Sequence, residues 1–238
     1  MVIGPATSEI PLTYLDSFLS SGILEFLDAV SVHPYRNYSK SPETAADDYA
    51  NLRKLISQYA PEGKKNMPVI SSEWGYSTFT KGISKETQSQ FIVRMQLSNC
   101  LNGIPLSIWY DWMDDGKDPD EREHNFGTVT NDLKPKPSYQ TVQVMNNQLN
   151  GFTLMRRLHL ENDSDYALVF RNEKNDYKIV AWTTGDAHSV TIVNDLSEFN
   201  NVKAVDGMGK AIEPKAEKRN LILELQGLPQ YINLNSEI

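Results

Sequence analysis

The residues best suited to chemistry lie where short apolar runs of the sequence end. The run 28–33 ends in His33, with Tyr35 two positions further on, and the run 67–72 leads directly into Glu73. A carboxylate at the end of an apolar strand is partly buried, which is costly unless neighbouring groups stabilise it. Because His33 or Tyr35 could hydrogen-bond such a carboxylate and hold its geometry, Glu73 is the first candidate for a catalytic group.

A third run, 104–110, leads into a cluster of aromatic side chains. Trp109 and Trp112 could each present a flat face on which a sugar ring stacks, although either could equally be a core residue. Glu73 also has an alternative role, because it could simply pair with an arginine such as Arg36 or cap a helix. The absence of Val, Ile or Leu at these three run ends favours a functional interpretation.

The elements that must position these residues alternate along the first half of the chain. Short apolar runs predict strands, and apolar residues at helical spacing predict the helices between them. The expected strands are 1–7, 28–33, 67–72 and 104–110, and the expected helices begin near residues 12, 42, 84 and 137. This alternation predicts a parallel sheet with right-handed crossovers. The carboxyl ends of its strands, where ligands bind in such folds, would bring the candidate residues together.

The pattern changes beyond the polar stretch 146–151. Apolar residues then recur with a period of two, and turn residues such as those at 162–164 and 185–186 separate the runs. This predicts an antiparallel β-sandwich of seven or eight strands. We therefore expect an α/β domain over 1–148 and a sandwich over 149–238. The sandwich has few exposed-looking aromatics, which indicates a structural buttress.

Composition excludes several functional classes. The 238 residues include 23 Lys and Arg against 31 Asp and Glu, so the net charge is 23 − 31 = −8, which argues against binding to nucleic acid or to an anionic membrane. Apolar residues make up 39% of the chain, enough for a core. Cys100 is the sole cysteine, which excludes an internal disulfide. No stretch is long enough for a membrane span and no signal-peptide pattern opens the sequence, so we expect a soluble chain of unknown location.

Five motifs together resemble glycoside hydrolase clan A, with families 39 and 5 the nearest. They are Val32–Tyr35, Ile70–Gly75, Ile108–Trp112, Glu123–Gly127 and Lys134–Tyr139. No single motif is specific, but the set is. The resemblance implies a (β/α)₈ barrel followed by a β-sandwich, and hydrolysis of β-linked sugars in oligosaccharides or polysaccharides.

The resemblance also implies roles for the residues at the strand ends. Glu73 matches the clan's nucleophile on the seventh barrel strand, which attacks the anomeric carbon in a retaining mechanism. Either Trp109 or Trp112 matches the aromatic platform. The substrate-binding residues implied are His33, Tyr35, Trp74, Trp109, Asp111 and Trp112. Neither a cofactor nor a metal is implied.

The second carboxyl of this mechanism has no counterpart at a strand end. In the clan it is a Glu preceded by Asn on the fourth barrel strand, whereas the Asn-Glu pair at 172–173 falls in the expected sandwich. The strands of this sequence match barrel strands five to eight. We therefore expect a half-barrel with two open sheet edges, which invite a complementary N-terminal half-barrel or a second copy of the chain.

A second copy would not restore the usual arrangement of carboxylates. In an eight-stranded barrel made of two copies, the two Glu73 side chains would lie on strands three and seven. The catalytic carboxylates of the clan lie on strands four and seven. We expect little or no glycosidase activity from this chain alone. The rival interpretations are a non-catalytic carbohydrate-binding or assembly module, and a truncated product that a separate polypeptide completes.

The acidic loop that follows the fourth strand leaves further options open. Residues 111–123 include seven carboxylates, which are interpreted as a solvated loop of which some members could line a sugar subsite. A metal site that combines His124 with these aspartates has no ligand spacing to support it.

Overall fold

The computed structural model describes residues 1–193, 198–199, 202–234 and 237, and the chain divides into two compact units, 1–134 and 135–238. Each unit is described by itself. Within the described residues, none of the helices combines the length and the apolar character needed to cross a membrane.

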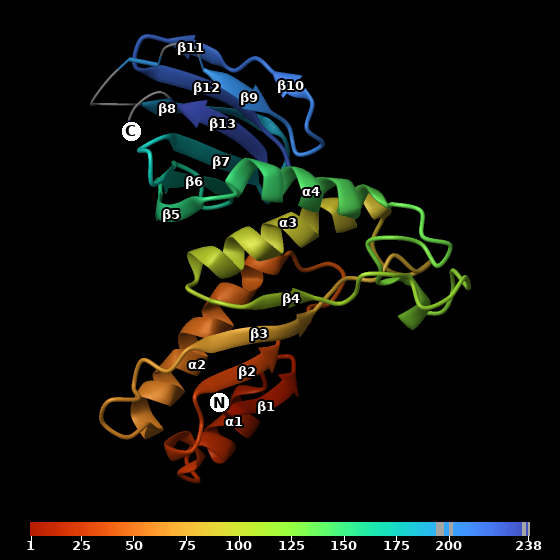
Figure 1. Cartoon of the computed structure of the whole chain (residues 1–238), viewed down its shortest axis with the longest axis vertical. Coiled ribbons are helices and arrows are strands. Elements are labelled where there is room, and N and C mark those ends of the chain that lie inside the picture. The colour runs from red at the N-terminus through yellow and green to blue at the C-terminus, as the bar shows by residue number, and fades with distance from the viewer. Residues whose placement is uncertain (194–197, 200–201, 235–236, 238) are drawn as a thin grey trace. The chain divides into compact units, whose positions relative to one another are not determined.

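The first unit is a four-stranded parallel sheet whose consecutive strands are connected by helices (Figure 1). The strands follow the chain order β1-β2-β3-β4, as the alternating pattern predicts. They are β1 (Ile3–Ser8), β2 (Ala29–His33), β3 (Val69–Trp74) and β4 (Ser107–Trp109). The helices are α1 (Leu12–Leu19), α2 (Ala45–Tyr59) and α3 (Lys85–Leu101). The chain as a whole is therefore mixed α/β, with a parallel sheet followed by antiparallel ones.

Local sequence signals set the helix ends. Ser84 caps α3 by accepting a hydrogen bond from the backbone N–H of Thr87 at 3.0 Å. The helix expected to begin near residue 12 ends at Leu19, and Gly22, with a φ of +87°, prevents it from continuing into the apolar residues that follow. A short 3₁₀ turn, η1 (Ile23–Glu25), follows, and another, η2 (Pro42–Thr44), precedes α2.

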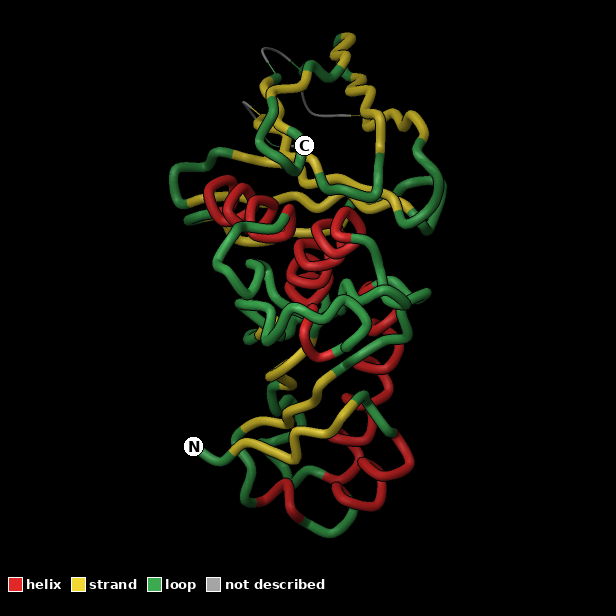
Figure 2. Tube along the Cα trace, turned by 90° about the vertical axis from the view of Figure 1, so that its right-hand side faces the viewer, coloured by secondary structure: helices red, strands yellow, loops and turns green. Residues whose placement is uncertain are grey.

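The two faces of this sheet differ in character. Val30 and Val32 belong to the apolar core that includes Leu52 of α2, and α1 and α2 lie on one side of the strands (Figure 2). The alternate residues Ser31 and Ser72 hydrogen-bond to each other through their hydroxyls at 2.6 Å. This pairing satisfies polar groups on the face opposite the valines, as the two-residue period of a strand requires.

The edges of the sheet carry exposed apolar side chains. The edge strands are β1 and β4. Ile3 in β1 is 44% exposed, and Leu106 and Ile108, before and within β4, are 46% and 45% exposed. Exposed apolar residues on unpaired edges are sites of association.

The second unit consists of helix α4 and two antiparallel sheets. The larger sheet has the order β10-β9-β13-β7-β6-β5 and the smaller β11-β12-β8. The elements are α4 (Pro137–Leu149), β5 (Phe152–Arg157), β6 (Asp165–Asn172), β7 (Tyr177–Thr183), β8 (His188–Val193), β9 (Lys203–Val205), β10 (Ala211–Ile212), β11 (Lys215–Glu217), β12 (Asn220–Leu225) and β13 (Gln230–Leu234). The short apolar run 158–160, which follows β5, forms no strand.

Helix α4 packs with the sandwich, whereas the sequence pattern placed it in the first domain. Lys178 Nζ of β7 donates to the carbonyl oxygen of Gln148 at 2.6 Å, and Gln140 Nε2 donates to the carbonyl oxygen of Met208 at 3.0 Å. These contacts join both ends of α4 to the sheet that follows it. The compact units therefore divide between Lys134 and Pro135.

One ion pair joins the two sheets of the sandwich, and we expect it to make the stability of the sandwich depend on pH. His188 Nε2 of β8 lies 2.9 Å from Oδ2 of Asp165 in β6, and Asp165 is buried. A hydrogen bond to the carbonyl oxygen of Asp186, followed by the Asp165 contact, raises the pKa of His188. Because its pKa is higher in the folded state, protonated His188 stabilises the sandwich. This stabilisation is complete below the pKa of histidine in the unfolded chain, about 6.5, and is lost as the pH rises through the pKa of His188 in the folded state.

We expect the free energy of unfolding of the sandwich to fall between about pH 5.5 and pH 8, and to fall less in His188→Gln. Urea titrations at both pH values measure the difference. His159→Gln changes another histidine of the same unit and should keep the wild-type slope. An identical slope in His188→Gln would contradict the linkage.

Candidate functional site

The carboxylate of Glu73 sits at the carboxyl end of β3, where two side chains from the end of β2 reach it. Tyr35 Oη donates a hydrogen bond to Glu73 Oε1 at 2.8 Å, and His33 Nδ1 lies 3.8 Å from the same oxygen. Because β2 and β3 are neighbours in a parallel sheet, their ends bring these three residues together. The Glu73 side chain is 39% exposed, so its carboxylate is held and yet open to solvent.

The tyrosine remains a hydrogen-bond donor to this carboxylate. Burial, then the hydrogen bond to Glu73 and its negative charge, raise the pKa of Tyr35 far above the ordinary value of a phenol. The phenol therefore stays protonated and directs its O–H at Oε1. Within the described part of the chain, no hydrogen bond engages Glu73 Oε2, which leaves that oxygen for a ligand.

A pocket of about 690 Å³ lies in front of Glu73. Its walls come from the segments that follow β1, β2 and β4, all of which lie at the carboxyl ends of the strands. The lining residues besides Glu73 are Ser8, Glu9, Tyr35, Arg36, Asn37, Tyr38, Tyr110, Arg122, Glu123 and Phe126. This volume lies within the range of roughly 300–1,000 Å³ that small-molecule sites occupy.

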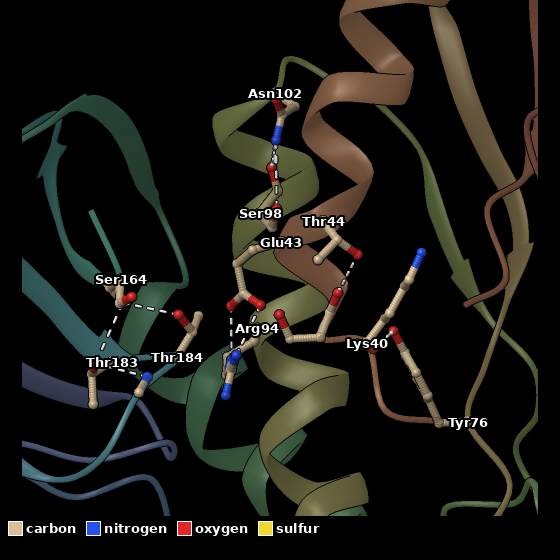
Figure 3. Close-up of polar contacts among 12 residues, drawn as sticks. Lys40, Glu43, Thr44, Tyr76, Arg94, Ser98, Asn102, Ser164, Thr183 and Thr184 are labelled. Carbon is tan, nitrogen blue, oxygen red and sulfur yellow. Dashed lines mark hydrogen bonds and ion pairs between the residues drawn. The ribbon is translucent and has the colours of Figure 1, made fainter. Parts of the chain in front are cut away.

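The segment after β2 is fixed by its own contacts. Arg36 Nη2 donates to Asp48 Oδ2 at 2.7 Å, and its Nη1 donates to the carbonyl oxygen of Tyr35 at 3.3 Å. Tyr76 Oη donates to the carbonyl oxygen of Lys40 at 3.0 Å (Figure 3). The alternative role of Glu73 as a partner of Arg36 is not what the structure shows, since this guanidinium pairs with Asp48.

The segment after β4 is tied to the one after β3. Ser77 Oγ donates to the carbonyl oxygen of Arg122 at 2.7 Å, and the backbone N–H of Thr78 donates to the carbonyl oxygen of Asn125 at 2.9 Å. Gln88 Nε2, buried in α3, donates to the carbonyl oxygen of Phe126 at 3.2 Å. These bonds hold Arg122, Glu123 and Phe126 at the pocket.

Gly75 lets the two strand ends approach closely. A Cβ atom at this position would lie 1.8 Å from the carbonyl oxygen of Tyr110. Glycine is therefore required at position 75. Any side chain there would push β3 away from the segment after β4, which forms the far wall of the pocket.

Three of the seven sequence-predicted residues converge at the carboxyl ends of β2 and β3, and Trp74 is directed away from them. His33, Tyr35 and Glu73 are together, as expected from the strand ends. Trp74 is fully buried in the core of the first unit, which corrects its assignment as a substrate-binding residue. Side chains alternate along a strand, so Trp74 points to the face opposite Glu73.

The remaining predicted residues lie outside the lining of this pocket. Trp109 is half-buried, stacks on Tyr76 with ring centroids 6.4 Å apart, and donates from Nε1 to the carbonyl oxygen of Phe126 at 3.3 Å. Trp112 is 62% exposed, so it is the tryptophan with a free face. The backbone carbonyl of Asp111 accepts from Thr128 at 3.2 Å. None of these three lines the pocket.

Two further carboxylates line the pocket: Glu9, which the sequence assigned no role, and Glu123, one of the loop carboxylates expected to include lining residues of a sugar subsite. Glu9 follows β1 at the same edge of the sheet, and its φ of +57° is uncommon for a residue with a side chain. Its position after the first strand is the signal that could have identified it. Glu123 lies in a 3₁₀ turn, η3 (Glu123–Asn125), whose distance from β4 hides it from a strand-end search.

The fold resembles that of glycoside hydrolases in clan A, represented by solved structures of families 39, 51 and 30. A family 39 glycoside hydrolase from Bacteroides cellulosilyticus WH2 matches 92% of this chain with a TM-score of 0.79 and 25% identity. A GH51 arabinofuranosidase from Xanthomonas axonopodis pv. citri matches 98% with a TM-score of 0.68 and 9% identity. A GH30 endoxylanase from Clostridium papyrosolvens C71 matches 99% with a TM-score of 0.58 and 13% identity.

The similarity has clear bounds. The chain spans about half the length of these structures, covering 46%, 58% and 56% of them in the same order. No protein-family model matches the sequence, and no curated protein matches it either. The GH51 and GH30 structures are only 9% and 13% identical to this chain, so their similarity supports the fold alone.

Proposed function

We propose that this chain carries the nucleophile half of a retaining glycoside hydrolase that acts on β-linked sugars, with Glu73 as the nucleophile. The observation that carries the proposal is the Glu73 carboxylate itself. One of its oxygens accepts a hydrogen bond from Tyr35 at 2.8 Å, and the residue lines a pocket of about 690 Å³. Resemblance to clan A and the similar family 39 structure support the same assignment.

The proposed chemistry is a double displacement. Glu73 Oε2 attacks the anomeric carbon of the bound sugar, and the glycosidic C–O bond breaks as the leaving oxygen takes up a proton from the carboxylic acid that a complementary N-terminal half-barrel would supply. The product is a glycosyl ester on Glu73. Water then attacks the same carbon, loses a proton and releases the sugar with a free carboxylate. Tyr35 donates its hydrogen bond to Oε1 throughout and so keeps Oε2 aimed at the pocket.

The first unit is proposed to be half of a (β/α)₈ barrel. The support is its four parallel strands in sequential order, with β1 and β4 left as edges and apolar residues exposed along them. A complementary N-terminal half-barrel is the proposed partner, with a second copy of the chain as the alternative. Either partner would pair with the edge strands β1 and β4. Only the N-terminal half-barrel would also supply the proton donor that is usual in the clan.

Covalent labelling of Glu73 tests the function directly. Activated 2-deoxy-2-fluoro glycosides form a stable ester with a nucleophilic carboxylate and need no proton donor. We expect the intact mass to rise by one fluorosugar and the modified peptide to contain Glu73. Glu73→Gln should stay unlabelled, while Glu123→Gln should label as the wild type does. Sugar binding without any labelling would instead favour a non-catalytic carbohydrate-binding module.

A further inference from the structure

A second pocket, of about 430 Å³, lies within the sandwich unit. Its walls come from the turn after β9, the segment that joins β10 to β11, the strand β12, and the loop that joins β12 to β13. Figure 1 places these strands together in the blue part of the chain. The volume is in the range of small-molecule sites.

Close packing fixes both loops that frame this pocket. Asp206 Oδ1 accepts hydrogen bonds from the backbone N–H groups of Met208 at 3.0 Å and Lys210 at 2.9 Å, which closes the turn after β9. The next residue, Gly207, packs its backbone against the loop between β12 and β13, since a Cβ there would lie 2.4 Å from Leu228 Cγ. The pocket is therefore preformed.

Polar groups of the lining have hydrogen-bonding capacity to spare. Gln230 is only 6% exposed, and its Nε2 donates to the carbonyl oxygen of Glu224 at 2.9 Å. Its Oε1 accepts no hydrogen bond from the described residues. The Glu224 carboxylate accepts from Ser189 Oγ through Oε1. The side chains of Glu213 and Gln226 also line the pocket and make no hydrogen bond within the described ranges.

Acceptors outnumber donors around this space. The cationic side chain of the lining, Lys215, has its Nζ 2.6 Å from Glu217 Oε1 and so is already paired. The carboxylate and amide oxygens of the lining favour a ligand that donates hydrogen bonds, and the Gln226 amide adds a donor of its own. Ile212, Ile222 and Leu228 supply apolar surface beside them. A ligand that matches both features combines several hydroxyl groups with C–H faces.

We propose that this pocket is a binding site for a neutral oligosaccharide, separate from the Glu73 pocket. Sugar hydroxyls donate to the carboxylate and amide oxygens, and the C–H face of a ring packs on the isoleucine and leucine side chains. The carboxylates exclude an acidic sugar by charge repulsion. The lack of exposed aromatics had indicated a purely structural sandwich, but polar groups with aliphatic neighbours serve the same recognition here. The proposal does not depend on the role of Glu73.

Nuclear magnetic resonance of the full chain tests the site. Titration with neutral di- to tetrasaccharides of β-linked xylose or glucose should shift the side-chain amide signals of Gln226 and Gln230 in a saturable way. A Kd near 1 mM corresponds to about −4 kcal/mol, so titration to about 10 mM reaches saturation. Glu213→Ala should weaken this Kd about tenfold. The matched control, Glu173→Ala, removes an exposed carboxylate elsewhere in the unit and should leave the Kd unchanged.

Two further arms separate this site from the alternatives. Glu73→Gln should leave the Gln230 shifts intact, because the pocket belongs to the other unit. The absence of shifts with any of the neutral sugars at about 10 mM, or shifts that Glu213→Ala leaves unchanged, would overturn the proposal. Shifts with spermidine but with none of the sugars would identify a cation site and overturn it equally.

Discussion

Hydrolysis by this chain is expected to depend steeply on the leaving group. A dinitrophenolate departs without a proton, so dinitrophenyl glycosides need only the nucleophile. Alkyl glycosides and disaccharides need a proton donor, which typically contributes about 10²–10⁴-fold to the rate. We therefore expect kcat/KM for alkyl glycosides to be lower by at least that factor. Steady-state assays of both substrate types with the purified chain measure the ratio.

Three carboxamide variants assign the result to particular carboxylates. Glu73→Gln should lower the rate on dinitrophenyl glycosides by about a thousandfold or more, because it removes the attacking oxygen. Glu9→Gln and Glu123→Gln are the matched controls, since both residues line the same pocket. Efficient turnover of alkyl glycosides that Glu73→Gln abolishes would show that the chain does supply a proton donor. Its loss in Glu123→Gln would then identify that donor.

The strand ends were predictable because parallel order leaves little freedom. Apolar runs alternate with helical periods, and sequential β/α units place successive strands side by side. Once β2 and β3 are parallel neighbours, His33 and Glu73 emerge at the same end of the sheet, where His33 Nδ1 lies 3.8 Å from Glu73 Oε1. Tyr35 reaches the same carboxylate from just beyond β2.

The sequence predicted the aromatic residues less well, because the side of a strand depends on register. The pairing of β3 with β4 shifts between Ser71 and Trp74, an irregularity that no local pattern announces. Trp74 consequently lies in the core, and Trp109 packs on Tyr76 with its Nε1 committed to a backbone carbonyl. A count of aromatic residues near strand ends does not distinguish such roles.

The sequence pointed to the acidic loop as a source of pocket residues, but it did not show which of the loop carboxylates would reach the pocket. Glu123 follows β4 by many residues, and its place depends on hydrogen bonds from Ser77 and Gln88 to the backbone of its neighbours. These donors come from a different loop and from α3, respectively. Their partners are backbone carbonyls, which carry no residue-type signature that a sequence could display.

Breaking the buried ion pair between Glu43 and Arg94 is expected to destabilise the first unit strongly. Arg94 Nε and Nη2 of α3 donate to the two carboxylate oxygens of Glu43 in η2 at 2.7 and 2.8 Å (Figure 3), and both side chains are at most 5% exposed. Glu43→Gln keeps the shape but leaves a guanidinium buried without its counter-charge. We expect the free energy of unfolding to fall by about 3–5 kcal/mol, measured by urea titration.

Removing one partner of the ion pair is expected to lower the free energy of unfolding more than replacing both partners by apolar side chains. The double variant Glu43→Leu/Arg94→Met removes both charges together, and it should recover most of the loss, because two apolar side chains of similar volume leave no charge to desolvate. Glu62→Gln is the surface control: its partner Lys65 lies at 2.8 Å, but both side chains are largely exposed, so its effect should stay below about 1 kcal/mol. A Glu43→Gln effect no larger than that of Glu62→Gln would mean that other groups satisfy the Arg94 guanidinium. In that case the join between η2 and α3, beside the segment that carries Tyr35, would rest on packing rather than on charge.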